Sequence, residues 1–150
     1  MDKNLSNLGE RLTELMFYDN NMTTRQLGAK LGVSSSTVSG WKNGTRSMLL
    51  SNALKLADYF ECSLSFLTGH SRDDKKLDYI PHPVPQFYNR LLEVLKEKGI
   101  TRYRLVKDTK FSNGNISRWK EQGDPLLQSV IDLADYFGYT LDHFVGRERL

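Results

Sequence analysis

The sequence contains few of the residues that stabilise secreted or metal-binding proteins. A single cysteine, Cys62, cannot form a disulfide within the chain, and that cysteine with three histidines gives no zinc-ligand spacing. No apolar run approaches the roughly 20 residues that span a bilayer, and the first residues, MDKNLSNLGER, lack the apolar stretch of a signal peptide. We therefore expect a soluble cytoplasmic protein with no disulfide, no metal and no membrane segment.

The composition is that of a folded protein rather than a disordered one. The chain of 150 residues is 39% hydrophobic and 26% charged, with a net charge of only +3. Such a length fits one ordinary domain or two small ones. The mild positive charge has meaning only once the basic residues are located along the chain.

An internal repeat decides between these alternatives. Residues 56–60, LADYF, recur as residues 133–137, and residues 41–42, WK, recur as residues 119–120. The copies differ in length at two places, both where loops are expected. Two copies of one small domain explain this pattern.

A different composition separates the copies. Residues 70–85, HSRDDKKLDYIPHPVP, hold six charged residues of alternating sign and three of the four prolines. Such a segment buries little and forms no regular helix. We predict a linker over 70–85 between a domain at 1–69 and a second, diverged domain at 86–150.

Apolar residues at spacings of three and four predict five helices in each copy. Thr23 and Ser34 are suited to cap the second and third helices of the first copy. The fourth helix is expected to begin at Ser47, and its counterpart at the pair Asp124-Pro125, because Asp is a good N-cap and Pro a good first helical residue. No segment of alternating β-branched residues competes, so the predicted fold class is all-α.

The first copy resembles a known DNA-binding family. Residues 22–44 read MTTRQLGAKLGVSSSTVSGWKNG, which is similar to the helix-turn-helix of the phage repressor and Cro family, also called the xenobiotic-response-element type. The following LADYF segment and a short helix ending in Gly also look like the family's fourth and fifth helices. The resemblance implies two tandem five-helix, lambda-repressor-like domains joined by the proline-containing linker.

The second copy departs from the family pattern at the turn between its second and third helices. Val106 replaces a small residue and Lys110 replaces the turn glycine. A position that needs φ > 0 tolerates Lys poorly, so we expect a distorted turn there.

The third helix of each copy is the expected recognition helix. A helix fits the major groove when its exposed side chains are small or polar and apolar residues hold its opposite face. Val38 and Trp41, and in the second copy Ile116 and Trp119, supply the buried side. The residues expected to face the bases are Ser35, Ser36, Ser39 and Gly40, and Asn113, Gly114, Ser117 and Arg118. Arg118 is the expected specificity residue, because Arg pairs bidentately with guanine.

Other polar residues complete the predicted DNA-binding set. The residues expected to contact phosphates are Thr24, Lys42, Asn43, Thr45, Arg46, Arg102, Tyr103 and Lys120. Residues beside them or at the start of the recognition helices are Arg25, Ser34, Ser112 and Asn115.

The charge distribution agrees with this assignment. Residues 90–120 carry nine basic and three acidic residues, whereas residues 121–150 carry two basic and six acidic ones. Residues 11–46 similarly carry five basic and two acidic residues. In each copy the basic residues thus lie on the half that contains the motif.

The interpretation is a sequence-specific transcriptional regulator, a repressor of prophage or mobile-element type, that binds double-stranded DNA at the nucleoid through both copies. The sequence leaves open whether the protein forms a homodimer. The alternative is a protein-interaction module on the same scaffold, in which the second copy mediates dimerisation or partner binding.

We expect no enzymatic activity, cofactor or small-molecule ligand, because no nucleophile–base pair or phosphate loop stands out. Cys62 is interpreted as a packing residue and His143, which replaces Phe66, as a half-buried helix residue.

Overall fold

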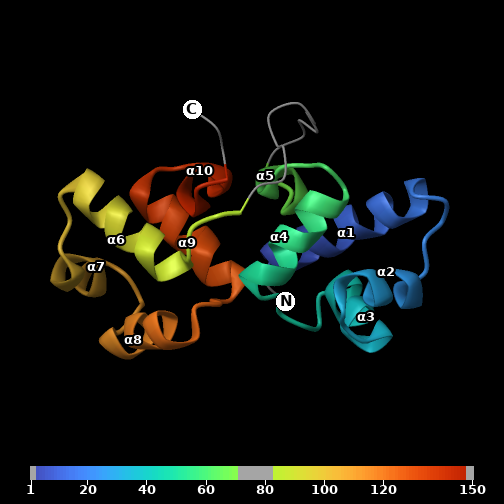
Figure 1. Cartoon of the computed structure of the whole chain (residues 1–150), viewed down its shortest axis with the longest axis horizontal. Coiled ribbons are helices and arrows are strands. Elements are labelled where there is room, and N and C mark those ends of the chain that lie inside the picture. Colours follow the sequence, from blue (N-terminus) through green and yellow to red (C-terminus); the bar gives the residue numbers. More distant parts are fainter. Residues whose placement is uncertain (1–2, 71–82, 148–150) are drawn as a thin grey trace. The chain divides into compact units, whose positions relative to one another are not determined.

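The computed structural model describes residues 3–70 and 83–147, and all its elements are α-helices (Figure 1). The chain divides into two compact units, Met1–Pro81 and His82–Leu150. The expected all-α fold with two tandem domains is therefore confirmed. Most of the predicted linker, residues 71–82, lies outside the described residues.

Each unit contains the five helices that the sequence predicts. Unit 1 comprises α1 (Lys3–Tyr18), α2 (Thr24–Leu31), α3 (Ser35–Asn43), α4 (Leu50–Tyr59) and α5 (Leu64–Leu67). Unit 2 comprises α6 (Phe87–Lys98), α7 (Arg102–Asp108), α8 (Asn113–Gln122), α9 (Leu127–Phe137) and α10 (Leu141–Val145).

Each unit is built around its own apolar core. The buried core side chains of unit 1 include Leu12, Leu27, Val38, Trp41 and Leu56. Their counterparts in unit 2 are Leu91, Leu105, Ile116, Trp119 and Leu133. The units differ at one position of this core, where Phe60 is half-buried and its counterpart Phe137 is buried.

Side-chain caps fix the start of the second and third helices in both units. The Thr23 hydroxyl accepts from the Gln26 backbone N–H at 3.1 Å, and the Gln26 side chain accepts from the Thr23 N–H at 2.9 Å. Ser34 caps α3 and Thr101 caps α7 by accepting from the backbone N–H of Thr37 and of Arg104, without a reciprocal side-chain bond to the cap N–H. Caps of this kind stabilise a helix by about 0.5–2 kcal/mol each.

The fourth helices begin later than predicted. α4 begins at Leu50 and α9 at Leu127, and neither has a side-chain cap. Before each helix the chain runs through a buried residue, Met48 or Pro125. Leu49 and Leu126, which directly precede the helices, have extended backbone, so the N-cap signals at Ser47 and Asp124 do not start a helix.

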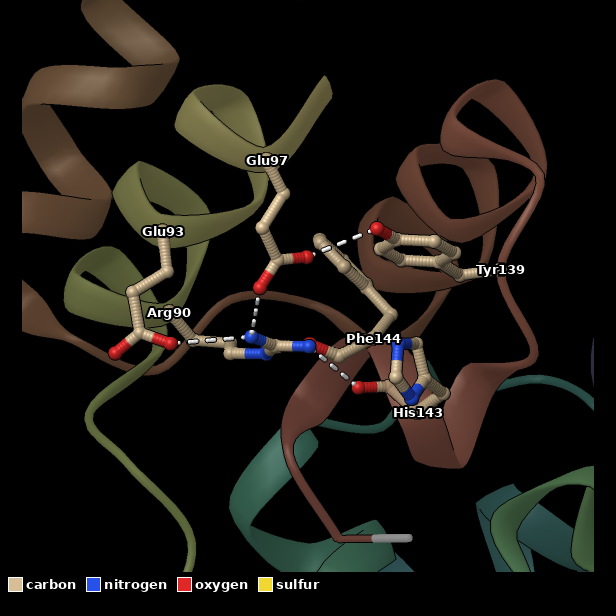
Figure 2. Close-up of polar contacts among 6 residues, drawn as sticks. All are labelled: Arg90, Glu93, Glu97, Tyr139, His143 and Phe144. Carbon is tan, nitrogen blue, oxygen red and sulfur yellow. Dashed lines mark hydrogen bonds and ion pairs between the residues drawn. The ribbon is translucent and has the colours of Figure 1, made fainter. Parts of the chain in front are cut away.

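Arg90 joins the first and last helices of unit 2 (Figure 2). Its guanidinium donates to the backbone carbonyls of Phe144 at 2.8 Å and His143 at 2.9 Å, which lie at the end of α10. It also donates to Glu93 at 3.1 Å and to Glu97 at 3.3 Å, on its own helix. Arg90 is only 8% exposed, so a largely buried guanidinium satisfies two helix-terminal carbonyls.

Tyr139 contacts both α6 and α10 at the same end of unit 2. Its hydroxyl donates to Glu97 at 2.9 Å, and its ring lies edge-on to His143 with a centroid distance of 4.5 Å. The Tyr139 hydrogen bond, with the Arg90 charge, holds the pKa of Glu97 below its ordinary value.

Candidate nucleic-acid interface

A close turn sets α3 against α2 in unit 1. Gly32 has φ 76°, and its N–H and that of Val33 both point back to the Gly28 carbonyl. A Cβ added to Gly28 would lie 2.6 Å from the Val33 carbonyl oxygen. The turn therefore needs glycine twice, once for a left-handed conformation and once for close backbone approach.

The equivalent turn of unit 2 is built differently, which confirms the expected distortion. α7 ends at Asp108, and Thr109 adopts an extended conformation with φ −122° and ψ 175°. The Thr109 hydroxyl donates to the Leu105 carbonyl at 2.7 Å and accepts from the Phe111 N–H at 3.2 Å. Lys110, at the position of the turn glycine, does not have a positive φ. Its ammonium lies 2.6 Å from a carboxylate oxygen of Asp132. The turn thereby avoids the strain that Lys at the glycine position would impose.

The outward face of α3 is narrower than the sequence predicts. Ser35 and Ser36 are exposed and Ser39 is half-buried, but Gly40 is buried. A Cβ on Gly40 would lie 2.7 Å from the Arg46 Cβ, so the stem of Arg46 covers this position. The expectation that Gly40 faces outward is therefore wrong, because a residue beyond the helix folds back over it.

Hydroxyl groups link the exposed residues of α3 to one another. The Ser34 hydroxyl lies 3.0 Å from that of Ser36 and 2.8 Å from that of Thr37. Thr24 on α2 hydrogen-bonds Ser35 at 2.8 Å, and Arg46 donates to Thr37 at 2.8 Å. Thr37 is absent from the predicted site, although its position three residues after the cap Ser34 is the signal that could have indicated it. This face offers hydroxyls and one guanidinium at its edge.

The outward face of α8 has stronger base-reading chemistry. Asn113, Gly114, Ser117 and Arg118 are all exposed, as predicted. Ile116 and Trp119, at 2% and 6% exposure, hold the opposite side of the helix. The rings of Phe87 and Phe111 lie edge-on to Trp119 at 5.6 and 5.1 Å. Aromatic packing therefore fixes which side of α8 faces outward.

Arg102 extends from α7 across this face, which the sequence does not predict. Its Nε donates to the Asn113 side-chain oxygen at 3.0 Å, and its Nη2 to the Asn113 backbone carbonyl at 3.1 Å and the Ser117 hydroxyl at 3.3 Å. It occupies the place that Thr24 has in unit 1. Two guanidiniums, Arg102 and Arg118, therefore lie on the outward surface of unit 2, one held in place by Asn113.

Arg118 differs from Arg102 in the hydrogen bonding of its guanidinium. In the portion of the chain that the structure describes, the Arg118 guanidinium has no hydrogen bond, ion pair or ring contact, and the residue is exposed. An unpaired guanidinium keeps all five donors for a base edge or a phosphate. Asn115, in contrast, accepts from the backbone and hydroxyl of Ser112, so its side-chain oxygen is used within the cap of α8.

The remaining predicted residues lie around the two helices. The exposed ones are Arg25, Asn43, Thr45, Arg46, Tyr103, Ser112 and Lys120. Lys42 and Thr24 are half-buried. These positions suit contacts at the rim of a groove, where phosphates lie.

Other kinds of site are not evident in the ranges 3–70 and 83–147. No helix there is long and apolar enough to cross a membrane. Nor do His, Cys, Asp and Glu side chains of these ranges form a group of three or more that could hold a metal ion.

Comparison with known families identifies both units. Residues 19–67 match a family model described as helix-turn-helix, and residues 90–147 match one described as a Cro/C1-type HTH DNA-binding domain. No curated protein and no solved structure matches the chain. Each match contains the second and third helices of one unit.

Proposed function

We propose that the chain is a sequence-specific transcriptional repressor of prophage or mobile-element type. Its two helix-turn-helix domains, the second matching the Cro/C1-type DNA-binding model, support a DNA-binding regulator. In this proposal α3 and α8 enter the major groove of neighbouring half-sites on one DNA duplex. Such a protein acts on the chromosomal DNA of the nucleoid.

The observation that carries the proposal is the outward face of α8. It combines an unpaired guanidinium at Arg118, a second guanidinium at Arg102 and the exposed amide of Asn113, over a side held by Ile116 and Trp119. Arg118 is the residue suited to guanine O6 and N7. Because Arg102 already occupies the Asn113 oxygen, Asn113 offers its amino group to an acceptor such as a phosphate or a carbonyl on a base.

Unit 1 contributes differently to this proposal. Its recognition face offers the hydroxyls of Ser35 and Ser36, which hydrogen-bond either donors or acceptors and therefore discriminate weakly between bases. Arg25 and Arg46 supply positive charge at its edges for phosphates. We assign to unit 2 the larger share of the specificity.

The direct test is selection of bound sequences from random duplex DNA with the full chain, followed by gel-shift measurements on the selected site over a series of salt concentrations. The affinity should fall steeply with salt, with a log–log slope that grows by about 0.9 for each phosphate neutralised. Recovery of no preferred sequence, or an affinity that does not change with salt, would contradict the proposal.

The alternative use of unit 2 as a protein-interaction module gains no support from α8. A surface that mediates dimerisation is expected to expose a contiguous apolar patch. The outward residues of α8 are instead polar or charged. A full chain in which Arg118→Ala leaves DNA binding unchanged but disrupts self-association would restore the alternative.

A further inference from the structure

The two recognition helices differ at one position that the repeat aligns. Gly40 corresponds to Arg118, because a tryptophan follows directly after each of them. Unit 2 therefore has a guanidinium on the helix itself, where unit 1 has no side chain. After the helices the difference is reversed, since Arg46 follows α3 whereas residues 123–125 after α8 are Gly, Asp and Pro. Each unit thus supplies an arginine here, from a different place in its sequence.

The stem of Arg46 lies where a side chain at position 40 would begin. A Cβ added to Gly40 would be 2.7 Å from the Arg46 Cβ, 3.4 Å from its Cδ and 3.5 Å from its Nε. Backbone hydrogen bonds fix this return of the chain, because the N–H groups of Thr45 and Arg46 both donate to the Gly40 carbonyl, at 2.9 and 3.2 Å. The side chain of Arg46 therefore passes through the space that the glycine leaves free.

The guanidinium of Arg46 lies about one turn nearer the start of α3. Its Nη1 donates to the Thr37 hydroxyl at 2.8 Å, and that hydroxyl also lies 2.8 Å from the hydroxyl of the cap residue Ser34. A side chain on a helix leans toward the N-terminus, over the residues three and four positions before it. The side chain of Arg118 is accordingly directed toward the turn of Asn115, the counterpart of Thr37. Both guanidiniums are thereby brought to the same turn of their recognition helices.

Most of the hydrogen-bonding capacity of the Arg46 guanidinium is unused. The residue is exposed, and within the described ranges its guanidinium has no other hydrogen bond, no ion pair and no ring contact. One of its five N–H donors is used by Thr37, and the others are available to a base edge. The bond to Thr37 and the contact with Gly40 also restrict a long side chain, so less conformational entropy is lost when it binds.

We propose that Arg46 is the guanine-reading residue of unit 1, and that Gly40 leaves the space through which it reaches the bases. Its guanidinium pairs with O6 and N7 of a guanine, the contact assigned to Arg118 in the other half-site. This inference rests on the proposed function and replaces the phosphate contact given to Arg46 there. It predicts that the two half-sites, although unlike elsewhere, share a guanine at corresponding positions.

The test uses the full chain, the duplex site that it selects and every single-base variant of that site, in gel-shift titrations. Arg46→Ala should weaken binding to the selected site by about 5- to 150-fold and remove the preference for guanine at one base pair. That pair should differ from the pair affected by Arg118→Ala. Equal weakening on every variant site would make Arg46 a phosphate contact and overturn the inference, while the proposed function would stand.

Arg46→Lys separates positive charge from hydrogen-bonding geometry. Lysine keeps the charge that a phosphate requires, but it lacks the planar fork of donors that pairs with a guanine edge. We therefore expect Arg46→Lys to lose most of the guanine preference. Arg25→Ala, the matched control, removes another exposed arginine of unit 1 and should weaken all site variants by the same factor. Unaltered affinity and preference in Arg46→Lys would contradict the base contact.

A double variant, Gly40→Arg with Arg46→Ala, transfers the arrangement of unit 2 to unit 1. Removal of the Arg46 side chain clears the space over position 40, and arginine favours a helix over glycine. The double variant should recover the guanine preference that Arg46→Ala loses, with an affinity within about threefold of the unaltered chain. If it stays as weak as Arg46→Ala while circular dichroism shows intact helices, the shared place of the two arginines is refuted. Absence of any sequence preference in the unaltered chain would refute this inference together with the proposed function.

Discussion

Among single residues, Arg118 has the clearest expected effect on DNA binding. It is exposed, and in the described ranges its guanidinium has no partner. We predict that Arg118→Ala weakens binding to the selected site by about 1–3 kcal/mol and relaxes the preference at one base pair. Gel-shift titrations against the selected site and its single-base variants measure both effects.

Arg104→Ala is the matched control for this prediction. Arg104 is also an exposed arginine of unit 2, but its Nε donates to Asp108 at 2.8 Å on its own helix. The Arg104→Ala substitution removes the same charge as Arg118→Ala without changing the outward face of α8. If the two variants lose affinity equally on all sequences, Arg118 contacts a phosphate rather than a base.

At this scale the sequence predicts most of the recognition face, but it does not predict how Arg102 and Gly40 are placed, for a common reason. The outward positions of α8 follow from the spacing of Ile116 and Trp119. Arg102 and Gly40, in contrast, depend on side chains that cross from one element to another: Arg102 reaches α8 from α7, and Arg46 returns over Gly40. Periodicity within one helix contains no information on such contacts.

Among the elements, the α2–α3 turn is the most sensitive part of unit 1. Gly28→Ala places a Cβ 2.6 Å from the Val33 carbonyl, and backbone atoms cannot move aside cheaply. We predict a loss of about 1–3 kcal/mol in the stability of unit 1. Denaturant unfolding followed by the fluorescence of Trp41, in a Trp119→Phe background, reports on this unit alone.

Gly114→Ala in α8 is the control for glycine removal. The nearest atom to its added Cβ is the Ser112 hydroxyl oxygen at 3.4 Å, an ordinary contact. Alanine favours the helix over glycine by up to about 1 kcal/mol, so this variant should be neutral or more stable. Because Gly114 lies in unit 2, its unfolding is followed by the fluorescence of Trp119 in a Trp41→Phe background. A similar loss in both variants would show that backbone approach at Gly28 is not the cause.

The contact between α6 and α10 gives a further prediction for unit 2. Arg90→Ala removes the side-chain donor of the Phe144 carbonyl and one of two donors of the His143 carbonyl, which also accepts from the Gly146 N–H at 3.1 Å, and we expect a loss of about 1–3 kcal/mol in the free energy of unfolding. The counterpart Arg11 lies 4.0 Å above the Phe66 ring and is more exposed. Arg11→Ala should therefore cost less, and chemical denaturation of both variants compares them. A larger loss for Arg11→Ala would contradict this account of Arg90.

The order of elements follows from the sequence, while some of their boundaries do not. Caps and three-and-four spacing predict all five helices of each unit, because these signals are local. The starts of α4 and α9 follow extended residues, Leu49 and Leu126, and have no side-chain cap, so no local signal marks them. An open cavity beside Cys62 in unit 1 is likewise beyond sequence patterns, since its lining residues come from helices that are distant in sequence.

For the whole molecule, we expect one chain to occupy two unlike half-sites. Helix-turn-helix dimers place their recognition helices about 34 Å apart. The 16 residues of the predicted linker at 70–85 extend to roughly 50 Å at about 3.3 Å each, so they permit this spacing. Footprinting with the intact chain should show two adjacent protected half-sites that do not form a palindrome.

Charge substitutions on each recognition face separate the two half-sites. Ser36→Glu in unit 1 and Arg118→Glu in unit 2 should each remove protection from a different half, since each adds a negative charge to one face only. Tethering raises the local concentration of the second unit, so each variant should also weaken the other contact. Protection of a single half-site of about 5 to 8 base pairs by the unaltered chain would contradict the two-site arrangement.

The unlike faces of α3 and α8 also bear on how such a protein changes over generations. In a dimer of identical subunits, one codon specifies both recognition helices, so a single mutation alters both half-sites together. Here the serines of α3 and the Asn and Arg of α8 are encoded separately. Under the proposed function, a mutation alters one half-site while the other retains the protein on its operator. A tandem chain can thus acquire a new operator one half at a time, through intermediates that still bind.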